Sequence, residues 1–380
     1  MTPPPRWRGS PERSTPGVRR ADAARRSYTA STRSAPPGRA HEETTLDPSK
    51  RRGLAASATA LALALSLSLA VPAPASAQAD AWPSKPIRLV SPFPPGGTTD
   101  LLARVFAPPL SQALGQQVIV ENRAGGSGSI GTGFVAKSPP DGHTFVVVFD
   151  THAVNPSLIP NLPFDTKADL APVMLVATGA MVITGHSSAQ PHKTFADLLA
   201  AAKANKGQPQ FGTIGSGSLA HLAMTQMGAQ AGFAGTHVPY KGGGPLAQDA
   251  IAGHVPVAIG SVALLAPHIR SGMLVPLAVT TAARDPVLPN VPTVAESGVP
   301  GFEATAWWGV LAPAKTPPEI VARMNAELAK LLRDPQIRER LSSQGMNIVA
   351  SQPEAFARFI DEQAAKWAKV VKDHGIRAGD

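Results

Sequence analysis

A repeated order of strand, glycine-rich turn and helix constrains the fold of this chain more than any other feature. Apolar runs rich in Val and Ile predict strands at Ile87–Val90, Val118–Val120, Phe145–Phe149, Val173–Ala177, Met181–Thr184, Val255–Ile259 and Leu274–Val279. Between them, Thr99–Leu114 places apolar residues at helical spacing, and Thr194 opens a second helix with a local cap. Alternation of this kind predicts an α/β fold with parallel, doubly wound sheets.

The last 65 residues depart from the alternation and predict helices packed back on a sheet. Thr316-Pro317-Pro318-Glu319 and Ser351-Gln352-Pro353-Glu354 both match a capping box, in which a hydroxyl and a carboxylate satisfy the first N–H groups of a helix. An amphipathic pattern follows each box. We therefore expect two C-terminal helices whose first turns are capped by these side chains.

The first 77 residues carry most of the net positive charge. They hold 12 Lys and Arg against 5 Asp and Glu, which leaves 23 against 21 in residues 78–380. A protein that reads nucleic acid through its phosphates needs a basic stripe on its folded part, so this function class is excluded. The chain has no cysteine, which excludes a disulfide scaffold, a thiolate metal site and a cysteine nucleophile.

Two segments make up this leader. Residues 1–46 are rich in Arg, Ser, Thr and Pro and are predicted to be a disordered basic extension; we expect translation to start near Leu46, so that the extension is not translated. Residues 47–77 have the layout of a signal peptide cleaved after Ala77, with Arg51-Arg52 leaving a twin-Arg route open. A transmembrane helix is the alternative, but the prolines and the small-residue cleavage pattern favour export.

Four glycine-rich turns between a strand and a helix are the candidates for a binding site. They span residues 92–100, 121–131, 212–218 and 240–245. In the first turn, Gly96 and Gly97 let backbone N–H groups point outward, where the positive end of the next helix can hold an anion without a side-chain cation. Each turn alone is explained equally well as an ordinary loop. Together they predict convergence on one small anion at the carboxyl ends of the strands.

A dinucleotide-dependent enzyme is the main alternative. Gly126-x-Gly128-x-x-Gly131 matches the dinucleotide fingerprint, and Asp150 lies where a ribose-binding acid would be found. The helix after Gly131 is short for a crossover, because Pro139-Pro140 follows it. The common serine-hydrolase, zinc-protease and phosphate-loop motifs are absent. The histidines lack metal-ligand spacing, so residues such as His143 are expected at the surface or at an edge.

Several motifs, in this order, resemble the Bug family, the substrate-binding receptors of tripartite tricarboxylate transporters. They are Trp82–Arg88, Pro92–Asp100, Val120–Arg123, Pro140–Gly142, Asn155–Leu158, His237–Gly242, Pro289–Glu296 and Trp307–Gly309. The resemblance covers nearly all of residues 82–375. It implies a two-lobed periplasmic-binding-protein (Venus flytrap) architecture, with residues 84–180 and 309–380 in lobe one, where the C-terminal helices pack, and residues 181–308 in lobe two.

The resemblance also implies the function. A receptor of this kind is an exported, monomeric, non-catalytic protein without a cofactor, which closes on a small carboxylate: a dicarboxylate, an amino acid or an aromatic acid. Its expected partners are this ligand and either membrane permease subunits or, as an alternative, a sensor protein. An exported dinucleotide-dependent oxidoreductase remains the other alternative.

The family's ligand contacts carry over to positions in the four turns and just after two strands. The first-lobe contacts would be Phe93, Gly96, Gly97, Thr98, Thr99, Asp100, Gly126, Ser127, Gly128, Ser129, Thr151, His152 and Asn155. The second-lobe contacts would be Thr213, Ser216, Gly217, Ser218, His221, Tyr240, Lys241 and Ser261.

Four of these side chains have ordinary structural explanations. Asp100 is expected to cap its turn rather than touch the ligand. His152 is explained equally well by loop packing, His221 by a satisfied position in the core, and Lys241 by solvation. The sequence also departs from the family pattern at Thr98, where many relatives have a third glycine, and at the small, flexible loop Gly215–Ser218.

Overall fold

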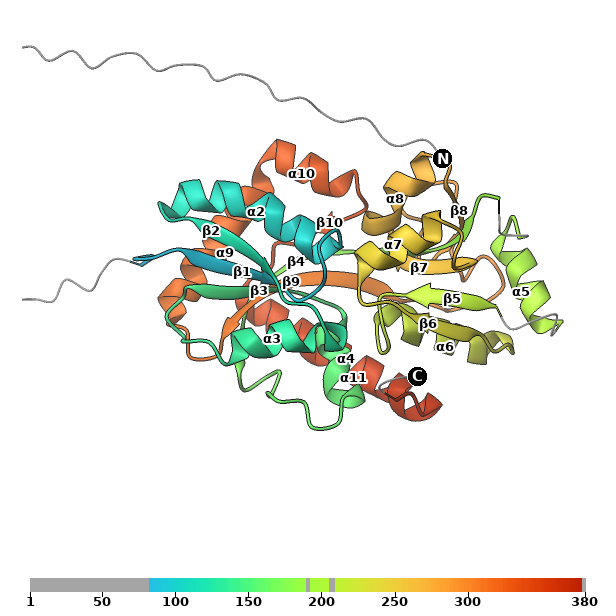
Figure 1. Ribbon diagram of the computed structural model, residues 1–380, viewed down its shortest axis with the longest axis horizontal. Coiled ribbons are helices and arrows are strands. Elements are labelled where there is room, and N and C mark those ends of the chain that lie inside the picture. The colour runs from blue at the N-terminus through green and yellow to red at the C-terminus, as the bar shows by residue number, and fades with distance from the viewer. Residues whose placement is uncertain (1–81, 189–191, 205–208, 378–380) are drawn as a thin grey trace, which may run out of the picture. The chain divides into compact units, whose positions relative to one another are not determined.

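The computed structural model describes residues 82–188, 192–204 and 209–377 (Figure 1). The predicted extension at 1–46 and the predicted signal peptide at 47–77 lie outside the described residues. Residues Ala77–Asp380 form one compact unit. Within the described ranges, no helix combines the length and the apolar character needed to cross a membrane.

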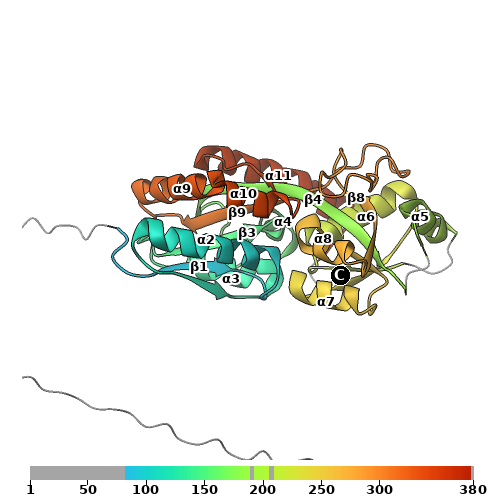
Figure 2. The ribbon, with the colours of Figure 1, turned by 90° about the horizontal axis from the view of Figure 1, so that it is seen from above.

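Ten strands of the described chain form one continuous sheet. Its order is β2 (Val118–Asn122), β1 (Ile87–Ser91), β3 (Thr144–Phe149), β9 (Thr305–Pro313), β4 (Leu170–His186), β7 (Val257–Ser261), β5 (Gln210–Thr213) and β6 (Thr236–Pro239). The remaining two of the ten strands, β8 (Leu274–Val279) and β10 (Asn347–Ile348), each pair with β4. The 17-residue strand β4 therefore holds the sheet together (Figure 2).

The partners of β4 change along its length. Residues Leu170–Ala180 pair with β9, and residues Met181–His186 pair with β7 and β8. We call β1, β2, β3, β9, β10 and the first part of β4 the first half of the sheet. The second half consists of the rest of β4 with β5, β6, β7 and β8.

Helices cover both faces of each half. In the first half, α2 (Thr98–Leu114) packs on one face and against α9 (Pro318–Arg333), while α3 (Ser129–Ala136), α4 (Thr151–Leu158) and α11 (Pro353–His374) lie on the other (Figure 1). In the second half, α7 (Gly243–Ile251) and α8 (Val262–Arg270) lie opposite α6 (Leu219–Ala231). The remaining helices are α5 (Phe195–Lys203) and α10 (Pro335–Ser342). The α/β class predicted from the alternation is confirmed.

Strand direction is mixed rather than purely parallel. β1 pairs in parallel with β2 and β3, and β5 pairs in parallel with β6 and β7, as expected for strands joined by helices. β4 runs antiparallel to β7, β8, β9 and β10, and β3 runs antiparallel to β9. Each of these antiparallel pairs thus involves β4 or β9.

β4 replaces two separate strands expected at Val173–Ala177 and Met181–Thr184. Gly179 lies between these two segments, within the continuous strand. A Cβ atom at Gly179 would lie 2.6 Å from the Gly345 carbonyl oxygen. The glycine therefore permits a close approach of two backbones and does not end the strand.

The two C-terminal capping boxes predicted from the sequence are wrong, although their helices form. No side chain caps α9, whose N-cap is Pro317, or α11, whose N-cap is Gln352. Ser351 Oγ instead accepts a hydrogen bond from Leu175 N–H of β4 and donates to the Gln352 carbonyl. By contrast, Thr194 and Asp197 form the complete box that was expected at the start of α5.

The adjacent tryptophans of β9 belong to opposite faces of the sheet, because successive strand residues alternate. Trp307 makes edge contacts with Phe356 and Phe359 of α11. Trp308 lies beside Phe149, and its Nε1–H donates to Thr98 Oγ1 at 2.8 Å. Both indoles are fully buried, so β9 fixes α11 on one side and the start of α2 on the other.

Candidate functional site

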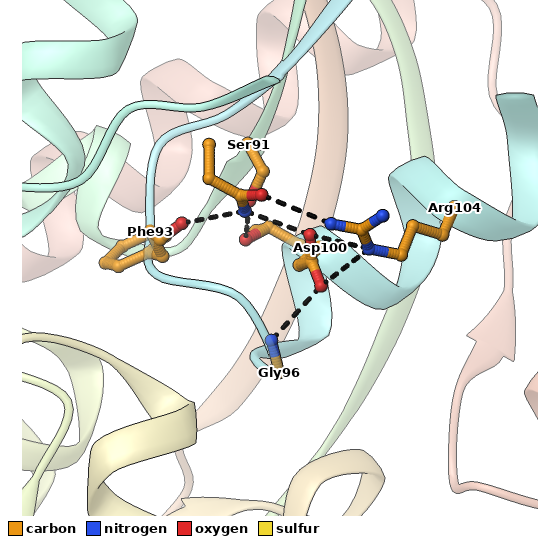
Figure 3. A network of polar contacts seen from close by, with 7 residues as sticks. Ser91, Phe93, Gly96, Asp100 and Arg104 are labelled. Atoms are coloured by element: carbon orange, nitrogen blue, oxygen red, sulfur yellow. Dashed lines mark hydrogen bonds and ion pairs between the residues drawn. The ribbon is translucent and has the colours of Figure 1, made fainter. Parts of the chain in front are cut away.

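The turn before α2 is held by the Asp100 carboxylate. Its Oδ2 accepts a hydrogen bond from Gly96 N–H at 3.1 Å, and both oxygens lie 3.0 Å from Arg104 Nε (Figure 3). Asn122 Nδ2 donates to Asp100 Oδ1 at 2.9 Å and to the Phe93 carbonyl at 3.1 Å. Asp100 therefore faces its own turn, as predicted for a residue that supports the loop.

Burial alone would raise the pKa of Asp100, but the hydrogen bonds from Arg104, Asn122 and Gly96 outweigh it and hold this pKa below its ordinary value. The carboxylate is thus ionised and fully engaged at neutral pH. The N-cap of α2 is Gly97, which provides no side-chain cap. The first N–H groups of α2 have no acceptor within the helix and lie beside the cavity described below.

The turn before α7 lies directly opposite. Its N-cap, Gly242, also provides no side-chain cap, so α7 likewise begins with unpaired N–H groups. A Cβ atom at Gly243 would lie 3.4 Å from Gly97 Cα, and one at Gly244 would lie 2.6 Å from the Pro95 carbonyl oxygen. The uncapped N-termini of α2 and α7, one from each half of the sheet, therefore meet at van der Waals distance because the residues between them are glycines.

A central cavity of about 20 Å³ adjoins this meeting point, with room for about one water molecule. Its lining residues are Phe93, Gly97, Thr98, Thr99, Phe149, Met181, Ile214, Ala220, Gly243, Ile259, Gly260, Ser261 and Leu264. They come from β3, β4, β7, α2, α6, α7, α8 and the turns between them. None of these described lining residues carries a charge.

The three hydroxyl groups of the central cavity are already hydrogen-bonded. Thr98 Oγ1 accepts from Trp308, and Thr99 Oγ1 lies 2.9 Å from Ser91 Oγ. Ser261 is the N-cap of α8, where its Oγ accepts from Leu264 N–H. The start of α8 is therefore capped, whereas α2 and α7 offer free backbone donors.

An outer pocket of about 390 Å³ adjoins the central cavity at Ile214, which lines both. Its other lining residues are Gly125, Gly126, Ser127, Ser129, Leu158, Ile159, Gly215, Ser216, Pro239, Tyr240 and Lys241. Lys241 is exposed here. Tyr240 donates its hydroxyl to Asp249 Oδ2 at 2.9 Å.

Ser127 joins the two halves across the outer pocket. It has a left-handed backbone (φ 51°), which is strained for a residue other than glycine. Its Oγ donates to the Ser216 carbonyl at 2.7 Å, and its own carbonyl accepts from Asn155 Nδ2 at 3.1 Å. These two bonds hold the strained turn and connect the second glycine-rich turn to the third.

A second polar contact between the halves involves Asp150, at the end of β3. Its Oδ1 accepts from Leu219 N–H, the first residue of α6, at 3.3 Å. Complete burial raises the pKa of Asp150 to about 8, and the hydrogen bonds from Leu219 and Thr151 N–H only partly oppose this.

Nearby in sequence, burial lowers the pKa of His152 to about 4. Asp150 Oδ2, His152 Nε2 and Asn155 Oδ1 are buried without a hydrogen-bond partner.

The start of α6 is a closed structural unit. Ser218 Oγ accepts from His221 N–H, and His221 Nδ1 accepts from Gly217 N–H at 3.1 Å. The His221 ring stacks on His237 with centroids 3.9 Å apart, and His237 Nε2 lies 2.7 Å from Thr213 Oγ1. The imidazole of His221 is buried and satisfied, which agrees with its structural explanation.

The structure divides the predicted contacts into three groups. Phe93, Gly97, Thr98, Thr99 and Ser261 line the central cavity, while Gly126, Ser127, Ser129, Ser216, Tyr240 and Lys241 line the outer pocket. Gly96, Asp100, Gly128, Thr151, His152, Asn155, Thr213, Gly217, Ser218 and His221 line neither. Members of this last group support the turns, as Asp100 and Ser218 do.

Sequence reasoning missed most of the apolar wall. Phe149, Met181, Ile214, Ala220, Ile259 and Leu264 line the central cavity but look like ordinary core residues. The one usable signal is position, because Phe149 and Ile259 lie near the carboxyl ends of buried strands, where open α/β sheets bind ligands. His143, expected at the surface or an edge, is buried, and its Nε2 accepts from Ser84 N–H.

Asp150 does not fit the role of the ribose-binding acid that the dinucleotide interpretation requires. A ribose-binding carboxylate must be ionised and reach the ligand, whereas Asp150 is buried, has a raised pKa and is bonded to α6. The first two glycines of the fingerprint lie instead in a short 3-10 turn, Gly126–Gly128, beside the outer pocket, and Gly131 lies within α3.

Comparisons with known proteins agree on one group. Residues 102–376 match the family model of the tripartite tricarboxylate transporter family receptor. Protein BugT of Bordetella pertussis is 38% identical over 301 residues, which cover 79% of this chain and 92% of BugT.

Solved structures agree as well. The periplasmic binding protein BugD is 31% identical, with a TM-score of 0.74 over 78% of this chain and all of BugD. An R. palustris protein, Rpa4515, whose structure was solved with adipate, is 35% identical, with a TM-score of 0.74 over 78% of this chain and 99% of that one. The chain therefore belongs to the tripartite tricarboxylate transporter receptor family, the group of solute-binding receptors that includes the Bug proteins.

Proposed function

We propose that this protein is a periplasmic receptor that captures a small carboxylate between the two halves of its sheet and delivers it to a membrane permease. One observation carries the proposal. The uncapped N-termini of α2 and α7, one from each half, meet beside a cavity whose described lining has no charged side chain. The adipate bound to the R. palustris relative supports the same ligand class.

The electrostatics favour an anion at this point. Each helix N-terminus carries a partial positive charge, so two of them facing each other repel unless an anion lies between them. An anion there accepts hydrogen bonds from N–H groups of both helices, and each hydrogen bond to a charged group contributes about 1.5–3 kcal/mol. Three or four such bonds account for a micromolar dissociation constant, which corresponds to about 8 kcal/mol.

Capture requires that the halves separate and close again. A cavity of about 20 Å³ does not admit a molecule the size of adipate. The halves are joined by β4, whose partners change between Ala180 and Met181, and we propose this region as the place where they flex. A ligand that contacts both halves then shifts the balance toward the closed form by its differential affinity for that form.

The remaining features of the proposal follow the family. The halves correspond to lobe one (residues 84–180 and 309–380) and lobe two (residues 181–308) of a monomer that needs no cofactor. The signal peptide directs export and is then cleaved after Ala77. The family description names a transporter, which supports a permease as the partner that receives the ligand.

The proposal is tested by calorimetric titration of the purified protein with monocarboxylates, dicarboxylates and amino acids, each paired with its uncharged amide. We expect at least one acid to bind at micromolar concentration and its amide not to bind. Small-angle X-ray scattering of the same samples should show a smaller radius of gyration in the bound protein. Equal binding of acid and amide, or no binding by any acid, contradicts the proposal.

A further inference from the structure

We propose that the ligand is a monocarboxylate with an apolar body, such as an aryl- or cycloalkyl-substituted acetate, rather than a dicarboxylate or an amino acid. This inference rests on the proposed function and specifies the substrate class of the same site. It is carried by the walls of the central cavity, which differ sharply in character on its two sides.

One wall offers backbone donors, at the N-termini of α2 and α7. The other is built from apolar side chains of separate elements, among them Phe149 of β3, Met181 of β4, Ile214 before α6 and Leu264 of α8. All four are at most 9% exposed. A ligand whose carboxylate sits at the helix ends therefore directs the rest of its structure against an apolar surface.

A second charge on the ligand would find no partner there. Neither Asp100 nor Asp150 lines the central cavity, so neither can pair with an ammonium group there. Lys241 lies in the outer pocket, not in the central cavity. Thr98 and Ser261 accept hydrogen bonds and can each still donate one, but a neutral hydroxyl does not balance the charge of a second carboxylate. Because an unpaired charge loses its hydration on burial, a second carboxylate or an ammonium group weakens binding by at least about tenfold.

The apolar wall has the opposite effect on a hydrocarbon body. Each methylene group removed from water improves binding by about fourfold. Met181, Ile214 and Leu264 lie on this wall, so a larger apolar body buries more of its surface there as the halves close. The walls thus favour a larger apolar acid over a small one.

Calorimetry with matched acids tests the inference on the unmodified protein. Cyclohexylacetate and adipate compare an apolar body with a second carboxylate. Phenylacetate and phenylalanine differ by one ammonium group, and phenylacetamide lacks the charge altogether. We expect cyclohexylacetate and phenylacetate to bind at least about tenfold more tightly than adipate and phenylalanine, and phenylacetamide not to bind.

The outcomes separate this inference from the proposed function. Tighter binding of adipate or phenylalanine overturns the apolar-acid class and leaves the carboxylate receptor intact. Equal binding of phenylacetate and phenylacetamide overturns the carboxylate receptor itself. Failure of all five compounds to bind at millimolar concentration overturns the apolar-acid class, and the wider panel of acids described above then decides the proposed function.

A substitution provides an independent test. Ile214→Lys places a cation on the apolar wall, and we expect it to shift the ratio of affinities toward adipate by about tenfold or more. Ile119→Lys is the matched control, because Ile119 is 43% exposed on β2 and lines neither cavity. An unchanged ratio in Ile214→Lys, in a variant that melts as cooperatively as the control, contradicts the inference. The ligand comparison on the unmodified protein decides the question if Ile214→Lys does not fold.

Discussion

Replacing Asp150 with asparagine should remove a pH-dependent loss of stability. The carboxyl is completely buried at the contact between β3 and α6, and burial raises its pKa from 3.8 to about 8. Below pH 4 it is protonated in both the folded and the unfolded chain and has no effect. Between pH 4 and pH 8 the unfolded chain releases the proton while the folded chain keeps it, so the free energy of unfolding falls as pH rises.

The size of the loss follows from the pKa difference. Each pKa unit corresponds to about 1.4 kcal/mol, so a difference of about four units amounts to about 6 kcal/mol above pH 8. Between pH 5 and pH 7.5 the loss is about 3 kcal/mol. The asparagine side chain would keep an acceptor for Leu219 N–H without ionising, so we expect Asp150→Asn to gain about 3 kcal/mol relative to wild type across this interval. Opening of the halves hydrates the carboxylate, which makes this figure an upper bound.

The assay is urea unfolding followed by circular dichroism at pH 5, 6, 7 and 7.5. His152 acts in the opposite direction, because its pKa is lowered to about 4 and protonation of the unfolded chain below pH 6.5 reduces stability. The informative quantity is therefore the difference between variant and wild type at each pH. Asp361→Asn is the control, since Asp361 is exposed and pairs with Lys167 at the surface. A difference that stays constant from pH 5 to pH 7.5 would refute the reasoning.

Three further substitutions separate closure from folding. Ser127→Ala removes the hydrogen bond to Ser216, a loss of about 1 kcal/mol, and should raise the Kd for a carboxylate by about fivefold in calorimetry. Ser138→Ala is the control, because it removes a comparable bond at the end of α3 and should leave Kd unchanged. Gly244→Ala places a Cβ atom 2.6 Å from the Pro95 carbonyl and should raise Kd more than about tenfold without lowering the Tm of the ligand-free protein, because alanine favours α7. Thr194→Ala breaks the capping box of α5 and should cost about 1 kcal/mol in urea unfolding with no change in Kd.

The fold was predictable where local chemistry decides the structure. Periodicity located β1 and α2 on either side of the first turn, and Gly97, Ser218 and Gly242 start helices where the sequence indicated. β9 was missed as a strand, because Thr305–Pro313 is buried on both faces and lacks alternation. The two strands expected at Val173–Ala177 and Met181–Thr184 are one strand, and the close approach of Gly345 that allows Gly179 between them is tertiary information.

The candidate site was predictable on its polar side only. Glycines and hydroxyls carry a visible signal when they recur in several turns between a strand and a helix, although each turn alone could be an ordinary loop. Phe149, Met181 and Leu264 carry none, since a cavity wall and a core are built from the same side chains. Which turns share a cavity also depends on the packing of the two halves, and this placed Ser127 and Ser216 in the outer pocket rather than beside Gly97.

The use of backbone donors from both halves bears on how such a receptor closes. An arginine on one half would bind an anion equally well in the open and closed forms and would therefore shift nothing between them. Here α2 provides donors from one half and α7 from the other, so an anion bound at α2 gains the hydrogen bonds from α7 only on closure. A shift from 1% to 99% closed requires a differential affinity of about 5.5 kcal/mol. Two charge-assisted bonds to α7, at about 1.5–3 kcal/mol each, are enough to supply most of it. The glycine at Gly244 is therefore as important as the donors, because a Cβ atom there would lie 2.6 Å from the Pro95 carbonyl oxygen and would keep the donors of α7 out of reach.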